Sequence, residues 1–459
     1  MTLKQIYTLK NSLLACVIAS AVGMAGCNKS SNVDPVAPSA TTVPVLANLT
    51  STGVQASGML TDYGSSLALT ALGVVYSASN ANPTLSDVQT NVGTNFLFKS
   101  DVTGLTPNTT YYLRAYATTD AGTGYGSVVT FKTSASTADT SVTVSTLAGS
   151  GTAGLTNGTG TGAAFNSPSG TAVDAQGNVY VTDSFNHLIR KITPAGVVTT
   201  FVGSGALGFN GGTATTAQFY SPNGIATDAA GNVYISDLGN NAIYKITSSG
   251  TVTILAGSGT AGYVNGAGSA AAFNAPQGLV ADASGNVYVA DQGNNRIRKI
   301  TSAGVVSTLA GTGAGGNING DGTTATFNRP YGLAIDAAGN LYVTDQGNYA
   351  VRKLTSAGVV STLVGNSVTT GLLNTPTGIA VDSQGALYIA DKSGRILTIT
   401  AANVLYTLAG KVNISSFADG SKTTAQFSGP TGIAVDASKN IYVADLNNNR
   451  IRKLVVTTK

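Results

Sequence analysis

One segment recurs along most of the chain: Pro276 to Gly311 has near-copies that each follow a proline in the same context. Successive prolines are 54, 54, 54, 46 and 54 residues apart. They are Pro168, Pro222, Pro276, Pro330, Pro376 and Pro430. A fixed period of this length indicates a supersecondary unit that cannot bury its apolar side chains alone and must pack against its copies.

Within one copy, four short runs of strand-forming residues alternate with turn residues. Gly278–Ala281 is continuously apolar, which is typical of a strand covered on both faces, and Val287–Ala290 is rich in β-formers. Ile297–Ile300 and Val305–Leu309 follow, and Gly, Asn, Asp and Ser fill the turns between the runs. Four antiparallel strands repeated six times predict an all-β fold, a β-propeller.

The two ends of the repeat array predict how the ring closes. Val144–Gly149 matches the fourth strand of a copy, without the first three before it. Ile451–Leu454 matches the third strand of the sixth copy, without a fourth after it. One blade would therefore combine both ends, which leaves no broken sheet edge. The sequence predicts a six-bladed propeller over residues 142–459.

The repeat pattern, P-x-G-[IL]-A-x-D-x-x-G-N-x-Y-[VI]-x-D-x-x-N-x-x-I-x-K, closely resembles the NHL repeat. The resemblance covers about two-thirds of the chain and implies an NHL-type propeller. The fifth copy departs from the pattern. Gly385-Ala386 replaces its Gly-Asn pair, its second turn is the shortened Lys392–Arg395, and the period of 46 instead of 54 means that eight residues are missing before Pro376.

The ionisable residues limit the chemistry that the chain can perform. Only 10% of the residues are charged, all 20 acidic residues are Asp, and His187 is the only histidine. Some relatives of this fold are metal-dependent lactonases or a zinc-dependent lyase, but neither ligand set can be built from one His and no Glu. We therefore expect a non-enzyme with no cofactor and no metal; a lyase or lactonase that uses Asp and Tyr is the alternative.

The N-terminus has the features of a secretory signal. Lys4 and Lys10 precede the apolar run Leu13–Met24, and small residues precede Cys27. Met24-Ala25-Gly26-Cys27 resembles a bacterial lipobox, which implies cleavage of residues 1–26 and lipidation of Cys27. An ordinary signal peptide or a simple membrane anchor are the alternatives. Asn28 in place of Asp suggests an outer-membrane lipoprotein of the cell envelope, facing either the periplasm or the exterior.

The remaining segments predict a tether, a sandwich and a linker. Residues 27–44 are Ser-, Pro- and Thr-rich, as in a flexible tether. Residues 45–134 contain alternating runs typical of a small antiparallel sandwich. Gly104 to Tyr111, followed by Leu113 to Ala117, resembles the fibronectin type III module, which implies that Tyr111 packs at a strand corner; Arg114 is expected on a solvated face. Residues 135–141 are expected to link this domain to the propeller.

Candidate ligand-binding residues lie where the innermost strands begin and where the second turns end. The residue after each repeat proline is polar and is expected to surround the mouth of the central channel. Loop residues nearby include Arg, Tyr and His, which together suit a protein or glycan ligand. The candidates are Ser169, Asn223, Gln277, Tyr331, Thr377 and Thr431, with Arg329, His187, Arg296, Tyr349 and Arg450 around them. The alternative for the turn Asn positions, and for His187, is a purely conformational role.

Other repeated residues are expected to have structural roles. The twelve repeat aspartates, two per copy, are expected to cap turns rather than to hold Ca²⁺, and Asn319–Gly322 is only a fragment of a calcium loop. The Arg-Lys pairs on the third strands, such as Arg298-Lys299, are expected on solvated edges. With a net charge of +4, or +2 after loss of Lys4 and Lys10, nucleic acid is not an expected partner. The leading hypothesis is a membrane-anchored binding protein; a structural envelope component is a further alternative.

Overall fold

The computed structural model describes residues 37–458 except 43–45, 48, 51, 63–67, 93–96, 134–139, 366–371 and 402–403. The described chain is all-β apart from short 3₁₀ turns. The signal segment, Cys27 and most of the tether lie outside the described residues. In the described ranges, no helix combines the length and the apolar composition required to cross a membrane.

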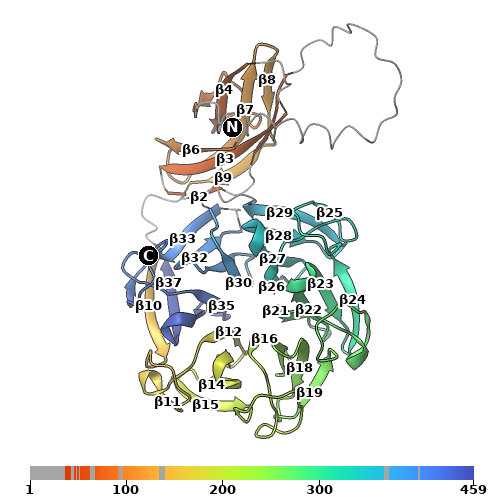
Figure 1. The fold of residues 1–459 in the computed structure, drawn as a ribbon. Coiled ribbons are helices and arrows are strands. Elements are labelled where there is room, and N and C mark those ends of the chain that lie inside the picture. Colours follow the sequence, from red (N-terminus) through yellow and green to blue (C-terminus); the bar gives the residue numbers. More distant parts are fainter. Residues whose placement is uncertain are drawn as a thin grey trace, which may run out of the picture. The chain divides into compact units, whose positions relative to one another are not determined.

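From Thr140 to Thr458 the described residues form six sheets around a common axis (Figure 1). The innermost strands are β12 (Pro168–Val173), β16 (Pro222–Thr227), β21 (Pro276–Ala281), β26 (Pro330–Ile335), β30 (Pro376–Val381) and β35 (Pro430–Val435). The second strands are β13 (Val179–Asp183), β17 (Val233–Asp237), β22 (Val287–Asp291), β27 (Leu341–Asp345), β31 (Leu387–Asp391) and β36 (Ile441–Asp445). Within one to two residues at each end, these are the strands that the sequence predicts.

The outer strands complete each sheet. The third strands are β14 (Leu188–Ile192), β18 (Ala242–Ile246), β23 (Arg296–Ile300), β28 (Ala350–Leu354), β32 (Arg395–Ile399) and β37 (Arg450–Thr458). The fourth strands are β15 (Val197–Val202), β19 (Val252–Ala256), β24 (Val305–Ala310), β29 (Val359–Gly365), β33 (Val404–Gly410) and β10 (Thr140–Ala148). Short edge strands that the sequence did not predict are β11 (Gly158–Thr159), β20 (Gly266–Ala267), β25 (Gly320–Asp321) and β34 (Gly420–Ser421).

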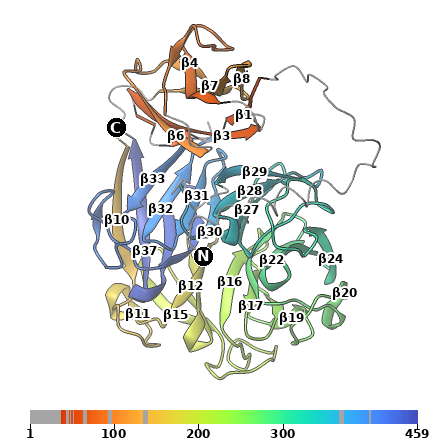
Figure 2. The same cartoon turned by 45° about the horizontal axis from the view of Figure 1, so that its top comes forward.

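The first and last strands of this array belong to one sheet. β10 pairs antiparallel with β37, and Val144 lies opposite Leu454. The predicted sharing of one sheet between the two ends is therefore confirmed, although β10 begins at Thr140, inside the predicted linker 135–141. The innermost strands contact one another in the cyclic order β12, β16, β21, β26, β30, β35 and back to β12 (Figure 1), and the turned view shows β12, β16 and β30 near the centre (Figure 2).

The glycine of each P-x-G motif permits this inner packing. A Cβ atom on Gly332 would overlap the backbone oxygen of Thr377 in the next innermost strand. The same overlap with the next strand occurs at each of the others: Gly170, Gly224, Gly278, Gly378 and Gly432. Glycine is required here because backbones of neighbouring sheets approach closely. Farther out, buried phenylalanines that precede the prolines, such as Phe273 and Phe327, pack between sheets.

Residues 39–132 form two groups of paired strands that enclose a core of their own. One contains β1 (Ser39–Thr42), β2 (Leu46–Ala47), β3 (Gly53–Asp62) and β6 (Leu97–Thr103). The other contains β4 (Leu69–Ser77), β5 (Val88–Gln89), β7 (Thr110–Thr119), β8 (Gly122–Tyr125) and β9 (Val129–Lys132). Because β1 pairs with β3, the prediction of a flexible tether was wrong at Ser39–Thr42. The hydroxyl of Thr42 accepts a hydrogen bond from the Ala115 N–H, which ties this strand to β7.

Two residues of this part were singled out from the sequence. The Tyr111 hydroxyl accepts a hydrogen bond of 3.0 Å from the Thr106 N–H, and its ring stacks on Phe131. Tyr111 therefore packs at the start of β7, as predicted for a corner tyrosine. Arg114 is half-buried on the less buried face of β7, where its Nε donates to the Pro83 oxygen at 2.6 Å and its guanidinium lies 4.1 Å from the centre of the Tyr125 ring. Arg114 thus holds a neighbouring loop.

Candidate functional site

The aspartates that end the innermost strands cap the following turns. Asp282 accepts hydrogen bonds from the Ser284 and Asn286 N–H groups, the Asn286 amide and the Tyr288 hydroxyl. Burial raises the pKa of Asp282, but these hydrogen bonds outweigh it and leave the pKa lowered. Backbone capping recurs at the equivalent residues, so the predicted structural role is confirmed: Asp174, Asp228, Asp336, Asp382 and Asp436.

The aspartates that end the second strands form buried ion pairs. The Arg298 Nη1 lies 2.6 Å from the Asp291 Oδ2, and both side chains are 0% exposed. Arg298 also donates to the oxygens of Ala272 and Val264 and to the Asn265 side chain, so it holds the long loop against the sheet. Equivalent pairs are Asp183–Arg190, Asp345–Arg352 and Asp445–Arg452. These aspartates therefore do more than cap turns.

The prediction that the Arg-Lys pairs lie on solvated edges was wrong for the arginines. Arg298 lies opposite Val289 in the strand pair, on the surface that packs between sheets, and Asp291 supplies the charge that makes its burial tolerable. The lysines stay half-buried. Lys299 Nζ lies 5.6 Å from the centre of the Tyr288 ring, a cation–π contact that other copies repeat.

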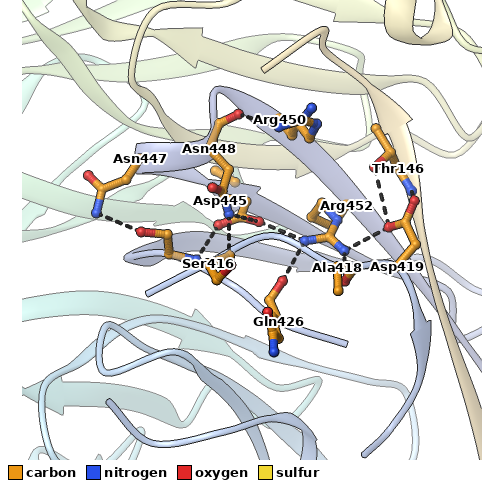
Figure 3. Close-up of polar contacts among 12 residues, drawn as sticks. Thr146, Ser416, Ala418, Asp419, Gln426, Asp445, Asn447, Asn448, Arg450 and Arg452 are labelled. Atoms are coloured by element: carbon orange, nitrogen blue, oxygen red, sulfur yellow. Dashed lines mark hydrogen bonds and ion pairs between the residues drawn. The ribbon is translucent and has the colours of Figure 1, made fainter. Parts of the chain in front are cut away.

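In the sheet that joins the two chain ends, the arginine has a second anionic partner. Figure 3 shows Arg452 between Asp445 and Asp419, with the Arg452 Nη2 2.7 Å from the Asp419 Oδ1. The other carboxylate oxygen of Asp419 accepts a hydrogen bond from the Thr146 N–H of β10. Asn319 occupies the equivalent position in the fourth copy and accepts from Arg352 and Thr362. Asn319, the first residue of the Asn319–Gly322 fragment of a calcium loop, therefore has a structural role.

In two copies the buried aspartate has no arginine at the register position of Arg298. In the fifth sheet Leu397 stands at the arginine register position, and Arg395 from the shortened turn instead reaches the Asp391 Oδ2 at 2.7 Å. Burial raises the Asp391 pKa, but Arg395 outweighs it and the pKa is lowered. In the second sheet Tyr244 replaces the arginine, and no basic side chain among the described residues pairs with Asp237. Burial raises the pKa of Asp237 to about 7.

The six residues after the repeat prolines surround the axis, but four are buried. Thr377 donates to the Pro430 oxygen and Thr431 to the Ser169 oxygen, each across a sheet boundary. Ser169 and Gln277 are also buried and bond to polar side chains of their own turns. These four side chains therefore join parts of the ring and are not presented to a ligand in this structure.

Tyr331 and Asn223 extend into the central channel. The two residues come from non-adjacent sheets and line the same cavity on the axis, and burial raises the Tyr331 pKa. A cavity of about 60 Å³ remains beside them. Tyr331 therefore largely fills the channel that the sequence predicted to have an open mouth.

Residues at the ends of the second turns link neighbouring sheets. Asn241, Asn295 and Asn449 have left-handed backbones with φ of 48°, 51° and 48°. Each side-chain oxygen accepts the N–H of the residue before the next proline. His187 takes the same position with φ 55°, and its Nδ1 accepts from the Ser221 N–H at 3.3 Å. All four positions thus have the left-handed backbone that the alternative, conformational role requires, and burial lowers the pKa of His187.

Arg296 and Arg450 support the loops. The Arg296 guanidinium lies 3.7 Å from the centre of the Tyr263 ring and donates to the Thr312 oxygen. Arg450 makes the corresponding contacts with the Phe417 ring and the Ser150 oxygen. Both side chains therefore have structural partners, which makes them less available to a ligand than the sequence suggested.

One end of the ring, the loop face, carries exposed departures from the repeat. We define it by the turns between second and third strands and by the residues that precede the repeat prolines. Phe185 is 64% exposed where other copies have Gly239, Gly293 and Gly347. Tyr220 is 48% exposed where other copies have Asn274, Asn328 and Asn374. Sequence reasoning missed Tyr220, which a column-by-column comparison of the copies would have found.

Two further departures have left-handed backbones that large side chains rarely adopt. Arg329 is exposed and has φ 55°, whereas the other left-handed residues before repeat prolines are Ser167, Ser221, Ala275 and Gly429. Tyr349 has φ 54° at the position of the linking asparagines. No group of three or more His, Cys, Asp or Glu side chains that could hold a metal ion occurs within the described part of the chain.

Comparison with known families identifies the repeats. Residues 165–192, 273–300 and 427–454 match the NHL repeat, and residues 373–399, from the divergent fifth copy, match the strictosidine synthase-like N-terminal family. The chain therefore carries NHL repeats. Among curated relatives, "Protein SUPPRESSOR OF QUENCHING 1, chloroplastic" from Arabidopsis thaliana is 34% identical over 91 residues, which cover 20% of this chain and 9% of that protein.

Teneurin-3 from Mus musculus is 28% identical over 219 residues, which cover 41% of this chain and 8% of that protein. The chain thus spans less than a tenth of the length of either relative. Among solved structures, a Xanthomonas campestris gluconolactonase aligns with a TM-score of 0.47 and 14% identity over 68% of this chain and 89% of that one. An auxiliary nutrient binding protein from Bacteroides thetaiotaomicron aligns with a TM-score of 0.38 and 15% identity over 89% and 95%. Neither structural similarity is strong enough to assign a function to this chain.

Proposed function

We propose that the chain is a lipid-anchored cell-envelope protein whose propeller presents a non-catalytic surface that binds a protein or a glycan. In this proposal the six sheets are the blades of a six-bladed propeller, and residues 39–132 are a fibronectin type III-like spacer. The cyclic contacts of the innermost strands support the blade count. The hydrogen bond and stacking of Tyr111 support the spacer.

The observation that carries the binding function is the set of exposed departures on the loop face. The repeated Asp, Arg and Asn side chains are engaged in turns, ion pairs and links between sheets. Phe185, Tyr220 and Arg329 depart from the repeat and are exposed. Exposed aromatic and arginine side chains on a rigid scaffold are typical of binding sites.

The test is a ligand screen with the mature chain, using saccharide arrays and pull-down of envelope proteins. Replacing Phe185 with Gly and Tyr220 with Asn restores residues that other copies carry, so the fold should be kept while binding is lost. Lys299→Gln, at the opposite end of a third strand, is the matched control. Unchanged binding by the double variant would place the ligand elsewhere, and turnover of lactones or polysaccharides by the purified chain would favour the enzyme alternative.

The anchor is supported by the lipobox-like Met24–Cys27 and is tested separately. Labelling of cells with an alkyne fatty acid should tag the wild-type protein, and Cys27→Ser should abolish the tag and release the protein from the membrane fraction. A Cys27→Ser protein that is still membrane-bound would contradict lipidation as the anchor.

A further inference from the structure

Three aromatic side chains form a cluster on the first and second sheets. Phe185 and His187 belong to one turn, η2 (Ser184–Asn186) with its end residue, and Tyr220 precedes the next innermost strand. The His187 and Tyr220 rings are 6.2 Å apart, and the Tyr220 ring covers Gly239, where a Cβ atom would overlap it. Phe185 and Tyr220 are exposed and His187 is half-buried, and the contact of the His187 and Tyr220 rings makes this aromatic cluster a preformed platform.

A cationic cluster lies on the fourth and fifth sheets. Arg329 and Lys392 are exposed on the loop face, and the Lys392 N–H bonds to the Thr375 oxygen beside the fifth innermost strand. The Lys411 N–H bonds to the Gly394 oxygen in the same shortened turn, so Lys411, which is also exposed, lies beside that turn and is counted in the cationic cluster. The described residues supply no ion-pair partner for these three side chains.

The propeller carboxylates leave this cluster uncompensated. Six are buried at the ends of the second strands, and six cap turns at the opposite end of the sheets. Asp419 is paired with Arg452, and Asp321 lies beside Val359 at the start of β29, away from the loop face. Unpaired positive charge at an exposed surface attracts an anionic ligand.

Tyr331 of the fourth sheet and Asn223 of the second lie between the two clusters and line the cavity on the axis. The cavity left there, about 60 Å³, is too small for a peptide side chain to insert as an anchor. An extended ligand would therefore lie over the face instead of entering it.

We propose that the loop face binds an anionic saccharide chain that lies across the axis. Sugar rings stack on the aromatic cluster through their C–H faces, and carboxylate or sulfate groups bond to Arg329 and Lys392. Aromatic platforms without a deep pocket suit sugar rings better than peptide anchors, and this favours a saccharide over an acidic peptide. The inference rests on the proposed binding function and names its ligand class.

The probes are an oligogalacturonate, a sulfated galactan oligomer and a neutral galacto-oligosaccharide of matched length, measured by calorimetric titration. We expect binding of one or both anionic probes and weakening with added salt. Binding of the neutral probe should be at least about tenfold weaker. Arg329→Ser, which restores the residue of the first two copies, should weaken anionic binding about tenfold, as should Tyr220→Asn. Lys299→Gln is the charge-matched control and should bind as wild type.

The outcomes separate this inference from the function on which it rests. Equal binding of the neutral probe, or tight binding of poly-aspartate that Tyr220→Asn does not weaken, would overturn the anionic-saccharide assignment and leave the binding function standing. Absence of any ligand in the wider screen would remove both. Thermal melting of each variant shows whether a loss of affinity reflects unfolding, and a loss in a fully folded Arg329→Ser protein supports the assignment.

Discussion

Asp237 is buried like the equivalent aspartates of the other copies, but Tyr244 stands at the position where four of those copies have an arginine partner. The carboxylate accepts hydrogen bonds from Tyr220 and Asn240, yet burial dominates and its pKa rises to about 7. Burial also raises the pKa of Asp291 despite its pair with Arg298, whereas at Asp391 the nearby Arg395 outweighs burial and keeps the pKa low. The pKa shifts of buried groups of this kind set how the free energy of unfolding depends on pH.

The Asp237 carboxyl should make the protein less stable as the pH rises from about 4 towards about 7. Its folded pKa lies above its unfolded value, so the stabilising protonated form is fully present below the unfolded pKa and is lost through the folded one. Each pKa unit corresponds to about 1.4 kcal/mol, which sets an upper bound on the order of 4 kcal/mol. Thermal melts across this range should show the trend, and Asp237→Asn should reduce it, because other buried aspartates with raised pKa values, such as Asp291, contribute in the same direction; an unchanged trend would contradict the assignment.

His187 should make the protein less stable as the pH falls, opposite to the effect of Asp237. Its Nδ1 accepts a backbone hydrogen bond, which requires the neutral ring, and burial lowers its pKa. The folded state therefore loses stability as the pH falls below about 6.5. His187→Asn restores the acceptor that other copies use, so it should keep neutral-pH stability and lose this acid sensitivity. Comparison of the melting temperatures of the two proteins at mildly acidic and neutral pH measures the difference.

Among the elements, the innermost strands are the least tolerant of added volume. Gly332→Ala would force a Cβ atom against the Thr377 oxygen, which belongs to a backbone that cannot move without shifting the next sheet. We expect a loss of about 2–3 kcal/mol in the free energy of unfolding. Gly162→Ala is the matched control, because a Cβ atom there has nothing within 4 Å. Chemical denaturation measures both, and equal losses would contradict the packing argument.

The four main strands of each sheet could be predicted from the sequence because strand-forming and turn residues alternate in the same order in each copy. The burial of Arg298 could not, because it depends on Asp291, seven residues earlier, and on loop oxygens that only the folded sheet brings near. Strand β1 was missed because Ser39–Thr42 lacks the apolar alternation of a strand. Of the candidate site, Arg329 and Tyr349 were selected by residue type, whereas the burial of Ser169 and Thr377 could not be predicted, because it depends on hydrogen bonds that form only around the axis of the folded sheets.

At the scale of the whole molecule, we expect the sheet that contains both β10 and β37 to make residues 140–458 unfold cooperatively. Val144 is buried in β10, opposite Leu454, and a charge there would be unpaired. We expect Val144→Asp to lower the free energy of unfolding by about 3 kcal/mol or more and to shift the transition as a whole, because the ring cannot stay closed without this sheet. Val305→Asp, at a half-exposed strand start, should change it by less than about 1 kcal/mol. Separate transitions in the Val144→Asp protein would argue against cooperative closure.

Because Thr140 and Thr458 face each other in one ladder, the ring has no privileged starting point. A short glycine bridge between these residues, with a new opening cut at the turn of Gly304, would preserve every strand pair within residues 140–458 of a circularly permuted chain. The break in this part of the chain could then lie at other turns without a change in how its strands pair.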